Sequence, residues 1–231
     1  MRDIKSIDII IPIYNAYEDL VECIDSVLSN TTNVEYRLLL IDDKSTDQRI
    51  AKYLKRLKKN NKKGNIFVLI NKENLGFVKT VNKGMAFSNS DVVLLNSDTI
   101  VTKNWLKKIV DCAYSNENIA TVTPLTNYGN TCSVPEFCKF NELPADLNIE
   151  EFALLIERVS LRKYPMIPSA VGFCMFIKRS VINEIGFFDE SYNKGYAEEA
   201  DFSCRAIEYG FINVLCDNAF VYHKGAKSFK E

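Results

Sequence analysis

The sequence predicts an α/β fold with a mostly parallel central sheet and helices on both of its faces. Two observations support this prediction. Short apolar segments alternate with longer segments in which apolar residues recur at helical spacing, as in chains that form parallel sheets. The short segments are continuously apolar, as expected for strands that are buried on both faces. With 231 residues, 47% of them hydrophobic, the chain is long enough for one domain with a substantial core.

The first half of the chain alternates regularly between the two kinds of segment. Apolar runs rich in Ile, Leu and Val predict strands at residues 7–13, 36–41, 66–70 and 92–95. The amphipathic segments between and after them predict helices at residues 16–30, 47–59, 77–88 and 102–114.

The second half is less regular. It predicts a strand at 121–124, a polar loop at 127–135, an acidic segment at 141–151 and a helix at 152–162. A strand around Gly172, a helix at 179–185 closed by Gly186, a helix at 197–209 and a strand at 211–222 complete the order. Long polar loops in such a domain often carry binding residues.

Polar residues follow each of the first four expected strands. Because the carboxyl ends of parallel strands meet at one edge of a sheet, we expect a ligand-binding cleft there. The residues concerned are Tyr14 and Asn15, then Asp42 and Asp43, then residues 71–76, and then residues 96–98.

Asp98 is the most informative of these residues. It stands three residues beyond the apolar run 92–95, at the exit of the expected strand, so its carboxylate could hold a metal ion and a phosphorylated ligand. Alternatively, Asn96, Ser97 and Asp98 cap the helix expected at Trp105, since all three are good N-cap residues. The local pattern leaves both interpretations open.

The adjacent acids Asp42 and Asp43 could accept a base N–H or a ribose hydroxyl. A helix cap by Ser45 or Asp47 is equally consistent with the pattern, and both roles can hold together. Further on, Gly76 permits a tight loop, and Lys79 follows it by one helical turn. Lys79 could meet a diphosphate, although a surface lysine is the more common explanation.

Three carboxylates, on Glu198, Glu199 and Asp201, lie at the start of an expected helix. The helix dipole accounts for some of this acidity, and a general base facing the cleft is the functional alternative. His223 is the only histidine. Its imidazole suits a divalent metal or acid–base chemistry, whereas a lone histidine is more often structural.

Charge and cysteine content narrow the class of protein. The net charge of −1 offers no basic excess for binding nucleic acid. The lysine-rich segment 52–63 predicts a solvated helix face, with attraction to anionic lipid as the alternative. Seven cysteines without metal-ligand spacing suggest no zinc site and a reducing cytoplasm. Without a signal-peptide pattern or a membrane-spanning apolar run, we expect a cytoplasmic protein, or one bound peripherally at the inner face of the membrane.

Seven segments in this order resemble the family 2 glycosyltransferases, which are inverting, nucleotide-sugar-dependent enzymes with a single GT-A domain and a Rossmann-like sheet. The resemblance covers nearly the whole chain. The segments are residues 9–15 with Pro12, 41–47, 73–77 with 82–84, 94–98, 172–176 with 186–190, 198–201, and 223–225.

The resemblance implies a role for each matching residue. Residues 7–115 would form the nucleotide-sugar-binding half, and residues 116–231 the half that binds the acceptor and carries the base. Asp98 and His223 would bind Mn²⁺ or Mg²⁺, Glu199 or Glu198 would be the catalytic base, and Gly172 and Asp201 would lie on the acceptor side. The nucleotide-sugar site would comprise Pro12, Tyr14, Asn15, Asp42, Asp43, Asn74, Gly76, Lys79, Asn96 and Ser97.

The implied reaction moves a sugar from a nucleoside-diphosphate sugar to a hydroxyl of a glycan, lipid-linked saccharide or protein, as in polysaccharide biosynthesis. Two residues depart from the family pattern. Glu199 stands where the family has an Asp, and Asn96 replaces the first acid of its Asp-x-Asp segment. These departures motivate an alternative, a catalytically silent domain that binds sugar nucleotides or serves as a scaffold.

Overall fold

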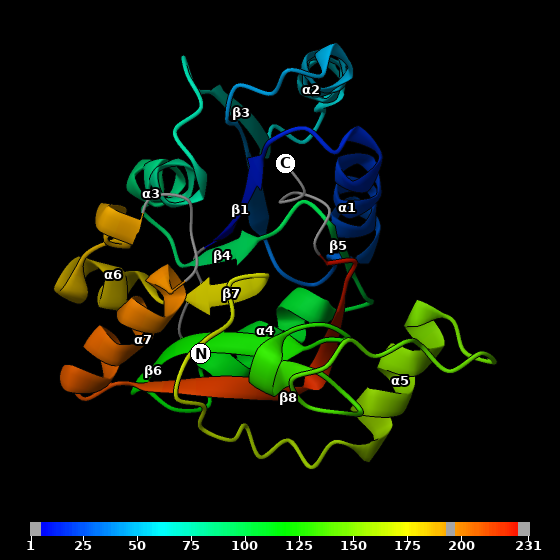
Figure 1. Cartoon of the computed structure of the whole chain (residues 1–231), viewed down its shortest axis with the longest axis vertical. Helices are drawn as coiled ribbons and strands as arrows, with labels where there is room; N and C mark the ends of the chain where they lie inside the picture. Colours follow the sequence, from blue (N-terminus) through cyan, green and yellow to red (C-terminus); the bar gives the residue numbers. More distant parts are fainter. Residues whose placement is uncertain (1–5, 193–196, 226–231) are drawn as a thin grey trace.

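The computed structural model describes residues 6–192 and 197–225 and places the strands in one eight-stranded sheet (Figure 1). The strands are β1 (Ile7–Ile13), β2 (Tyr36–Asp42), β3 (Ile66–Ile70), β4 (Val92–Leu95), β5 (Thr99–Val101), β6 (Ile119–Leu125), β7 (Cys174–Ile177) and β8 (Ile212–His223). The α-helices are α1 (Tyr17–Asn30), α2 (Gln48–Asn60), α3 (Phe77–Phe87), α4 (Trp105–Ala113), α5 (Ile149–Val159), α6 (Arg179–Ile185) and α7 (Glu198–Glu208).

The sheet has the order β3-β2-β1-β4-β7-β6-β8-β5. Strands β1 to β4 are parallel, and so are β6 and β8, which confirms the expected α/β fold with a mostly parallel sheet. Strand β7 runs antiparallel to both β4 and β6, an inversion that the sequence did not indicate. The carboxyl ends of β1, β2, β4, β6 and β8 and the amino end of β7 therefore share one edge.

Successive side chains of β1 point to opposite faces of the sheet, and helices cover both faces. Ile9 and Ile11 pack in the core formed with α1, α2, α4 and α5. Ile10 packs in a second core with α3, α6 and α7. Figure 1 shows α6 and α7 on one side of the sheet and α1 on the other. Burial on both faces explains why the strands are continuously apolar.

Strand β5 was not predicted, and its presence corrects two expectations. Because Thr99, Ile100 and Val101 pair with β8, helix α4 begins at Trp105 rather than at residue 102. Its N-cap is Asn104, so the interpretation of residues 96–98 as the cap of this helix is wrong.

The second half contains two smaller corrections. Helix α5 begins at Ile149, three residues earlier than expected, because Asn148 and Glu151 form a capping box. Gly172 lies in the turn before β7 rather than within a strand. No helix within residues 6–192 and 197–225 has the length and apolar character needed to cross a bilayer.

Candidate active site

Asp98 and His223 lie together at the shared edge of the sheet. Asp98 is in the turn between β4 and β5, and His223 ends β8 directly opposite Thr99. The Lys224 amide donates to the Asp98 carbonyl over 3.0 Å, which fixes the two segments. The Asp98 Oδ1 and His223 Nε2 atoms are 3.4 Å apart, and their side chains are only 9% and 13% exposed.

The His223 ring is held from the loop that follows β6. Its Nδ1 lies 2.9 Å from the Tyr128 carbonyl, and the Asn127 side chain bonds to both the amide and the carbonyl of His223. If Nδ1–H donates to Tyr128, a neutral ring presents its Nε2 lone pair to the Asp98 carboxylate. Burial opposes protonation, but Asp98 and the Tyr128 carbonyl outweigh it, so the pKa of His223 is raised.

A lone pair facing a carboxylate favours a cation between them, either a proton or a metal ion. The described residues contain no cluster of three or more His, Cys, Asp or Glu side chains suited to a metal. Two protein ligands still fit Mg²⁺ or Mn²⁺, because such ions often take their remaining ligands from substrate phosphates and water. The hydrogen bond at Nδ1 also matches the way metal-binding histidines are usually oriented.

Asn96 is anchored through its main chain. Its amide donates to the Phe173 carbonyl over 2.9 Å, and its carbonyl accepts from the Thr99 hydroxyl and the Cys23 thiol. The half-buried Asn96 side chain makes no hydrogen bond to the described part of the chain. A ribose or metal-shell role for this amide stays a prediction, as does any role of Ser97.

The turn before β7 connects this pair with the acids of α7. The Phe173 ring stacks on His223 with 5.3 Å between ring centroids. Next to it, a Cβ added to Gly172 would lie only 3.9 Å from Glu199 Cδ. Glu199 Oε2 is buried and has no hydrogen-bond partner among the described residues. The Glu199 carboxyl and the Asp98–His223 pair thus flank the Gly172–Phe173 segment.

The other two acids of this cluster differ from Glu199. Glu198 is 4% exposed, so it is more deeply buried. Asp201 forms an ion pair with Arg205 over 2.8 Å, and Arg205 also donates to the Ile185 and Phe187 carbonyls. Asp201 therefore holds Arg205, which in turn connects α7 to the end of α6, and the acceptor-side role of Asp201 stays a prediction.

Asp42 and Asp43 are both buried at the end of β2 but make different contacts. The Asp43 carboxylate accepts hydrogen bonds from the Asn71 side chain and from the Leu75 and Gly76 amides over 2.7 to 2.9 Å. Asp42 Oδ1 accepts from the Ser45 amide, whereas its other carboxylate oxygen has no hydrogen-bond partner among the described residues. Asp43 therefore shapes the loop, and Asp42 is the better placed of the two to meet a ligand.

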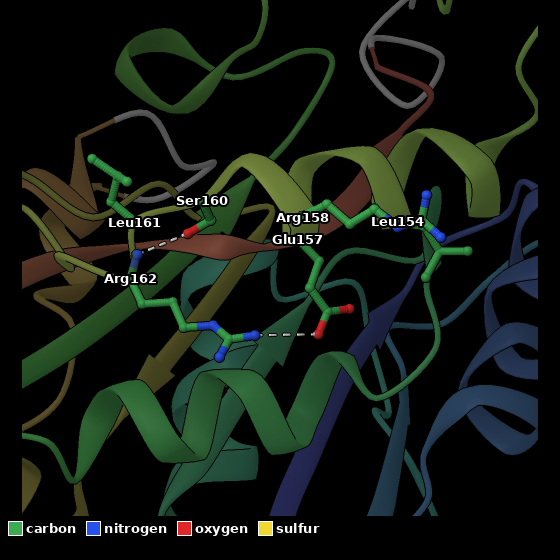
Figure 2. Close-up of a pocket in the computed structure, with 6 residues that line it drawn as sticks. All are labelled: Leu154, Glu157, Arg158, Ser160, Leu161 and Arg162. Carbon is green, nitrogen blue, oxygen red and sulfur yellow. Dashed lines mark hydrogen bonds and ion pairs between the residues drawn. The ribbon is translucent and has the colours of Figure 1, made fainter.

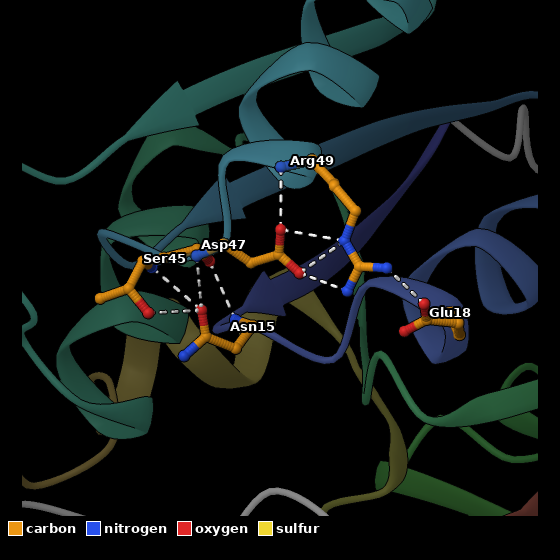
Figure 3. A network of polar contacts seen from close by, with 6 residues as sticks. Asn15, Glu18, Ser45, Asp47 and Arg49 are labelled. Carbon is orange, nitrogen blue, oxygen red and sulfur yellow. Dashed lines mark hydrogen bonds and ion pairs between the residues drawn. The ribbon is translucent and has the colours of Figure 1, made fainter.

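Asn15 organises the loop that follows Asp42 (Figure 3). Its Oδ1 accepts from the Thr46 amide and hydroxyl and from the Asp47 amide. Asp47 caps α2, as expected, and pairs with Arg49, which reaches Glu18 on α1. These contacts tie α1, α2 and the end of β1 together beside Asp42.

The other residues predicted for the nucleotide-sugar site have few recorded partners. Tyr14 is 44% exposed at the end of β1, two residues beyond the half-buried Pro12. Asn74 and Lys79 are exposed, and Gly76 adopts a positive φ of 80° in the loop between them. Lys79 forms no ion pair with a described residue. Their contacts with a ligand stay predictions.

Sequence reasoning did not single out Asn127, Tyr128 or Phe173, although they position His223. The predicted polar loop at 127–135 includes the first two, and the segment around Gly172 includes the third. No spacing pattern distinguishes them from their neighbours, because their roles arise from contacts between segments far apart in the chain.

A separate hollow of about 590 Å³ lies at the end of α5 (Figure 2). It is lined by Leu154, Glu157, Arg158, Ser160, Leu161 and Arg162. Arg162 points toward Glu157 and lies 3.7 Å from it. None of the predicted site residues lines this hollow, so it is distinct from the site around Asp98.

Comparisons with known proteins show the family and the fold of this chain. The model of the family "Glycosyl transferase family 2" matches residues 8–186. An uncharacterized glycosyltransferase of Haemophilus influenzae is 30% identical over 123 residues, which are 53% of this chain and 37% of that protein. Glycosyltransferase GlyG of Streptococcus pneumoniae is 25% identical over 232 residues, covering 96% of this chain and 72% of the relative.

Three solved structures share the fold at low sequence identity. GalNAc-T7 with UDP, GalNAc and Mn²⁺ has a TM-score of 0.75 and 17% identity, over 96% of this chain and 44% of that chain. The mannosyltransferase PcManGT of Pyrobaculum calidifontis, in complex with GDP-Man and Mn²⁺, has a TM-score of 0.71 and 15% identity, over 96% and 58%. TarS 1-349 of S. aureus has a TM-score of 0.66 and 18% identity, over 95% and 60%.

Proposed function

Because the chain belongs to glycosyl transferase family 2, we propose that it moves a sugar, with inversion, from a nucleoside-diphosphate sugar to a hydroxyl of a glycan, lipid-linked saccharide or protein. One observation carries this proposal. The Asp98–His223 pair and the Glu199 carboxyl flank the Gly172–Phe173 segment. A displacement with inversion needs a base and a leaving-group site on opposite sides of the reacting carbon, and a carboxyl on one side of this segment with the Asp98–His223 pair on the other supports such a reaction.

The donor would bind along the ends of β1, β2 and β4. Asp42 would accept a hydrogen bond from the base or ribose, because one of its carboxylate oxygens has no hydrogen-bond partner among the described residues. Asp43 would act indirectly by holding the loop that contains Gly76. Lys79, one turn into α3, would meet the diphosphate as an exposed cation. Residues 7–115 would thereby form the donor half and residues 116–231 the acceptor half.

Asp98 and His223 would hold a divalent cation, Mn²⁺ or Mg²⁺. The cation would supply positive charge against the nucleoside diphosphate that leaves the sugar. Support comes from His223 Nε2, which lies 3.4 Å from Asp98 Oδ1, and from the Mn²⁺ named with UDP and with GDP-Man in two structures of similar fold. Asn96, which replaces the first acid of the Asp-x-Asp segment, would contribute a neutral amide beside the cation in place of a second negative charge.

Glu199 would take the proton from the acceptor hydroxyl as that oxygen attacks the anomeric carbon. Its buried Oε2 lacks a hydrogen-bond partner among the described residues, and its carboxyl lies beside Gly172, where an added Cβ would be in ordinary contact with Glu199 Cδ at 3.9 Å. A glutamate is one methylene longer than the aspartate of the family pattern. The open space at Gly172 is consistent with that extra length.

A thermal-shift screen tests the proposed function. UDP-, GDP-, dTDP- and CMP-sugars would be added with and without Mn²⁺. We expect one nucleoside-diphosphate sugar to raise the Tm only with Mn²⁺, since a ligand at 100 times its Kd stabilises the folded state by about 2.7 kcal/mol. Asp98→Ala should abolish this shift. Asp111→Ala, which removes an exposed acid paired with Lys107 on α4, is the matched control and should retain it.

The same samples separate an enzyme from a silent binding domain. Release of nucleoside diphosphate from the stabilising donor, measured with Mn²⁺, is expected for the enzyme. If a sugar nucleotide raises the Tm but no nucleoside diphosphate is released with any of the acceptors tested, the silent binding domain is favoured. Absence of a shift with every sugar nucleotide, or a shift that persists in Asp98→Ala, would contradict the proposed site.

A further inference from the structure

Two exposed aromatic side chains stand beside the site on the loop that follows β6. Tyr128 is 37% exposed and Phe140 is 53% exposed. Their ring centroids are 5.9 Å apart in an edge-to-face arrangement, and the Tyr128 ring is 5.7 Å from that of His223. We call Tyr128 and Phe140 the aromatic platform. Together with His223 and the buried Phe173, it forms a continuous row of rings from the core to the surface.

The loop that carries the platform is held by buried polar side chains. Asn141, which is 7% exposed, donates to the Asn127, Glu136 and Lys139 carbonyls and accepts from the Glu136 amide. The fully buried Asn127 secures the other end of the loop to His223. The platform is therefore ordered in advance, which lowers the entropic cost of binding a ligand to it.

The platform lies near both proposed reacting groups. A Cβ added to Gly129 would lie 3.6 Å from the Phe173 ring, so the loop packs against the segment that flanks Glu199. On the other side, a Cβ added to Gly225 would approach Tyr128 to within 2.5 Å, which places the main chain just beyond His223 against the Tyr128 ring. A molecule resting on Tyr128 would thus sit beside His223 and close to the Gly172–Phe173 segment.

We propose that the aromatic platform binds a sugar ring of the acceptor, so that the acceptor is a saccharide. This inference rests on the proposed function. One face of a pyranose ring can be largely C–H, and such a face can lie against an aromatic ring while the hydroxyls at the ring edge stay in water or bond to polar groups. The Gly172–Phe173 segment next to the platform would bring a hydroxyl of that ring near the Glu199 carboxyl.

Charge favours a neutral sugar over an anionic ligand. Lys139 is the only cation in residues 126–141, and it is paired with Glu136. The loop therefore offers little attraction to a phosphate or to an anionic membrane, which basic residues would bind. Contiguous exposed aromatic rings next to a site are instead typical of surfaces that bind ligands with an apolar face.

Saturation-transfer NMR with a panel of methyl hexopyranosides and disaccharides tests this inference without requiring turnover. For at least one probe, we expect the strongest saturation at the C–H protons of one ring face. Phe140→Leu, which keeps an apolar side chain but removes the ring, should weaken binding of that probe by about 3- to 10-fold, since an aromatic contact contributes modestly to affinity. Phe140→Tyr should restore it.

Phe137→Leu is the matched control, because Phe137 is 64% exposed on the same loop and shares no ring contact with another described aromatic residue. It should leave probe binding unchanged. The inference is overturned if no saccharide binds the wild-type protein, or if Phe140→Leu binds the probe as tightly as the wild type. It is also overturned if the wild-type protein is a dimer that Phe140→Leu dissociates, because the platform would then be an interface between two copies. The donor-dependent Tm shift of the wild-type protein is measured in parallel. If no donor shifts the Tm, the proposed function is overturned. If a donor shifts the Tm but no saccharide binds, only the proposed role of the aromatic platform is overturned.

Discussion

Glu199 and Asp201 show how two acids in the first turn of one helix can have different surroundings. The Asp201 carboxylate is committed to Arg205, which ties α7 to the end of α6. The Glu199 carboxyl faces Gly172 and keeps a buried oxygen without a hydrogen-bond partner among the described residues. A general base must have a lone pair available to the acceptor, so the geometry favours Glu199 over Asp201.

The first prediction at this scale concerns the base. Glu199→Gln preserves shape but cannot accept the proton, so transfer should fall by about 100-fold or more while the donor-dependent Tm shift persists. Glu208→Gln, at the exposed end of the same helix, is the control and should transfer normally. Full activity of Glu199→Gln, with loss in Glu198→Gln instead, would move the role to Glu198. Initial rates with saturating donor provide the measurement.

The second prediction separates Asp42 from Asp43. Asp43→Asn replaces one accepting oxygen by an N–H donor facing the N–H groups of the 71–76 loop, so unfolding free energy should fall by about 1.5 to 3 kcal/mol. Asp42→Asn should leave the unfolding free energy nearly unchanged but weaken donor binding. The reason is that one oxygen of the Asp42 carboxylate has no hydrogen-bond partner among the described residues and would accept its hydrogen bond from the donor. Denaturant titration and donor thermal shifts distinguish the two outcomes, and the reverse pattern would contradict our assignment.

At the scale of elements, Gly84 sets how closely α3 approaches the sheet. A Cβ at this position would lie 2.7 Å from side-chain atoms of both Ile10 and Ile41, too close for ordinary contact. Helix propensity alone disfavours glycine in the interior of a helix, so packing must outweigh propensity here. The close approach also sets the position of Asn82, which exchanges two hydrogen bonds with the Phe188 main chain.

An exchange of glycine and alanine on α3 tests this packing. Gly84→Ala should lower the unfolding free energy by about 1 to 3 kcal/mol through overpacking, despite its gain in helix propensity. Ala86→Gly, at an exposed position of the same helix, should lower it by about 1 kcal/mol through propensity alone. A Gly84→Ala variant more stable than wild type in urea denaturation would show that the helix can move away without cost.

Across the whole molecule, the core restricts ionisation of its thiols. Burial raises the pKa of Cys23 and of Cys132 to about 12, and it raises the pKa of Cys174 and Cys216 well above the ordinary value. Two of the seven cysteines, Cys138 and Cys204, are exposed. The folded state therefore requires neutral thiols in its interior, whereas the unfolded chain can ionise them from about pH 9.

The resulting prediction concerns alkaline stability. Because these pKa values are raised on folding, the stabilisation is fully present below about pH 9 and is lost as the pH rises toward 12. We expect the Tm to be nearly constant from pH 7 to 8.5 and to fall above pH 9, with a shallower fall in Cys23→Ala. At pH 8, a thiol-alkylating reagent should modify Cys138 and Cys204 in the native protein and all seven cysteines in denaturant. Rapid native modification of Cys23 would contradict this account.

The burial of helix α2 bears on how its lysine-rich sequence is interpreted. Its apolar residues Ile50, Tyr53 and Leu54 are buried in the protein, and its lysines are exposed. No apolar side of α2 therefore remains to enter a bilayer, which fits the solvated helix face expected from the sequence. Attraction of the exposed lysines to anionic lipid stays a prediction. Association with a membrane would have to be electrostatic or involve another surface.

The sequence by itself determined the elements and the polar residues that end them. Strands 7–13, 66–70 and 92–95 and helix 179–185 match the structure because they depend on local patterns: continuous apolar runs, helical periodicity and a terminating glycine. Asp98 and His223 could be singled out as candidates for the same reason, since each stands at or just beyond the end of an apolar strand. The short β5 was missed because three residues carry too little pattern and its pairing with β8 is non-local.

Only the tertiary structure decided which of these residues meet. The register of β5 against β8 places Asp98 beside His223, the inverted β7 brings Gly172 and Phe173 to the same edge, and the Asn127 contacts orient the imidazole. It also directed the Asp43 carboxylate to the loop amides and left one carboxylate oxygen of Asp42 without a hydrogen-bond partner among the described residues. Such choices depend on strand pairing and on competition for hydrogen-bond donors between distant segments, and local sequence patterns contain neither.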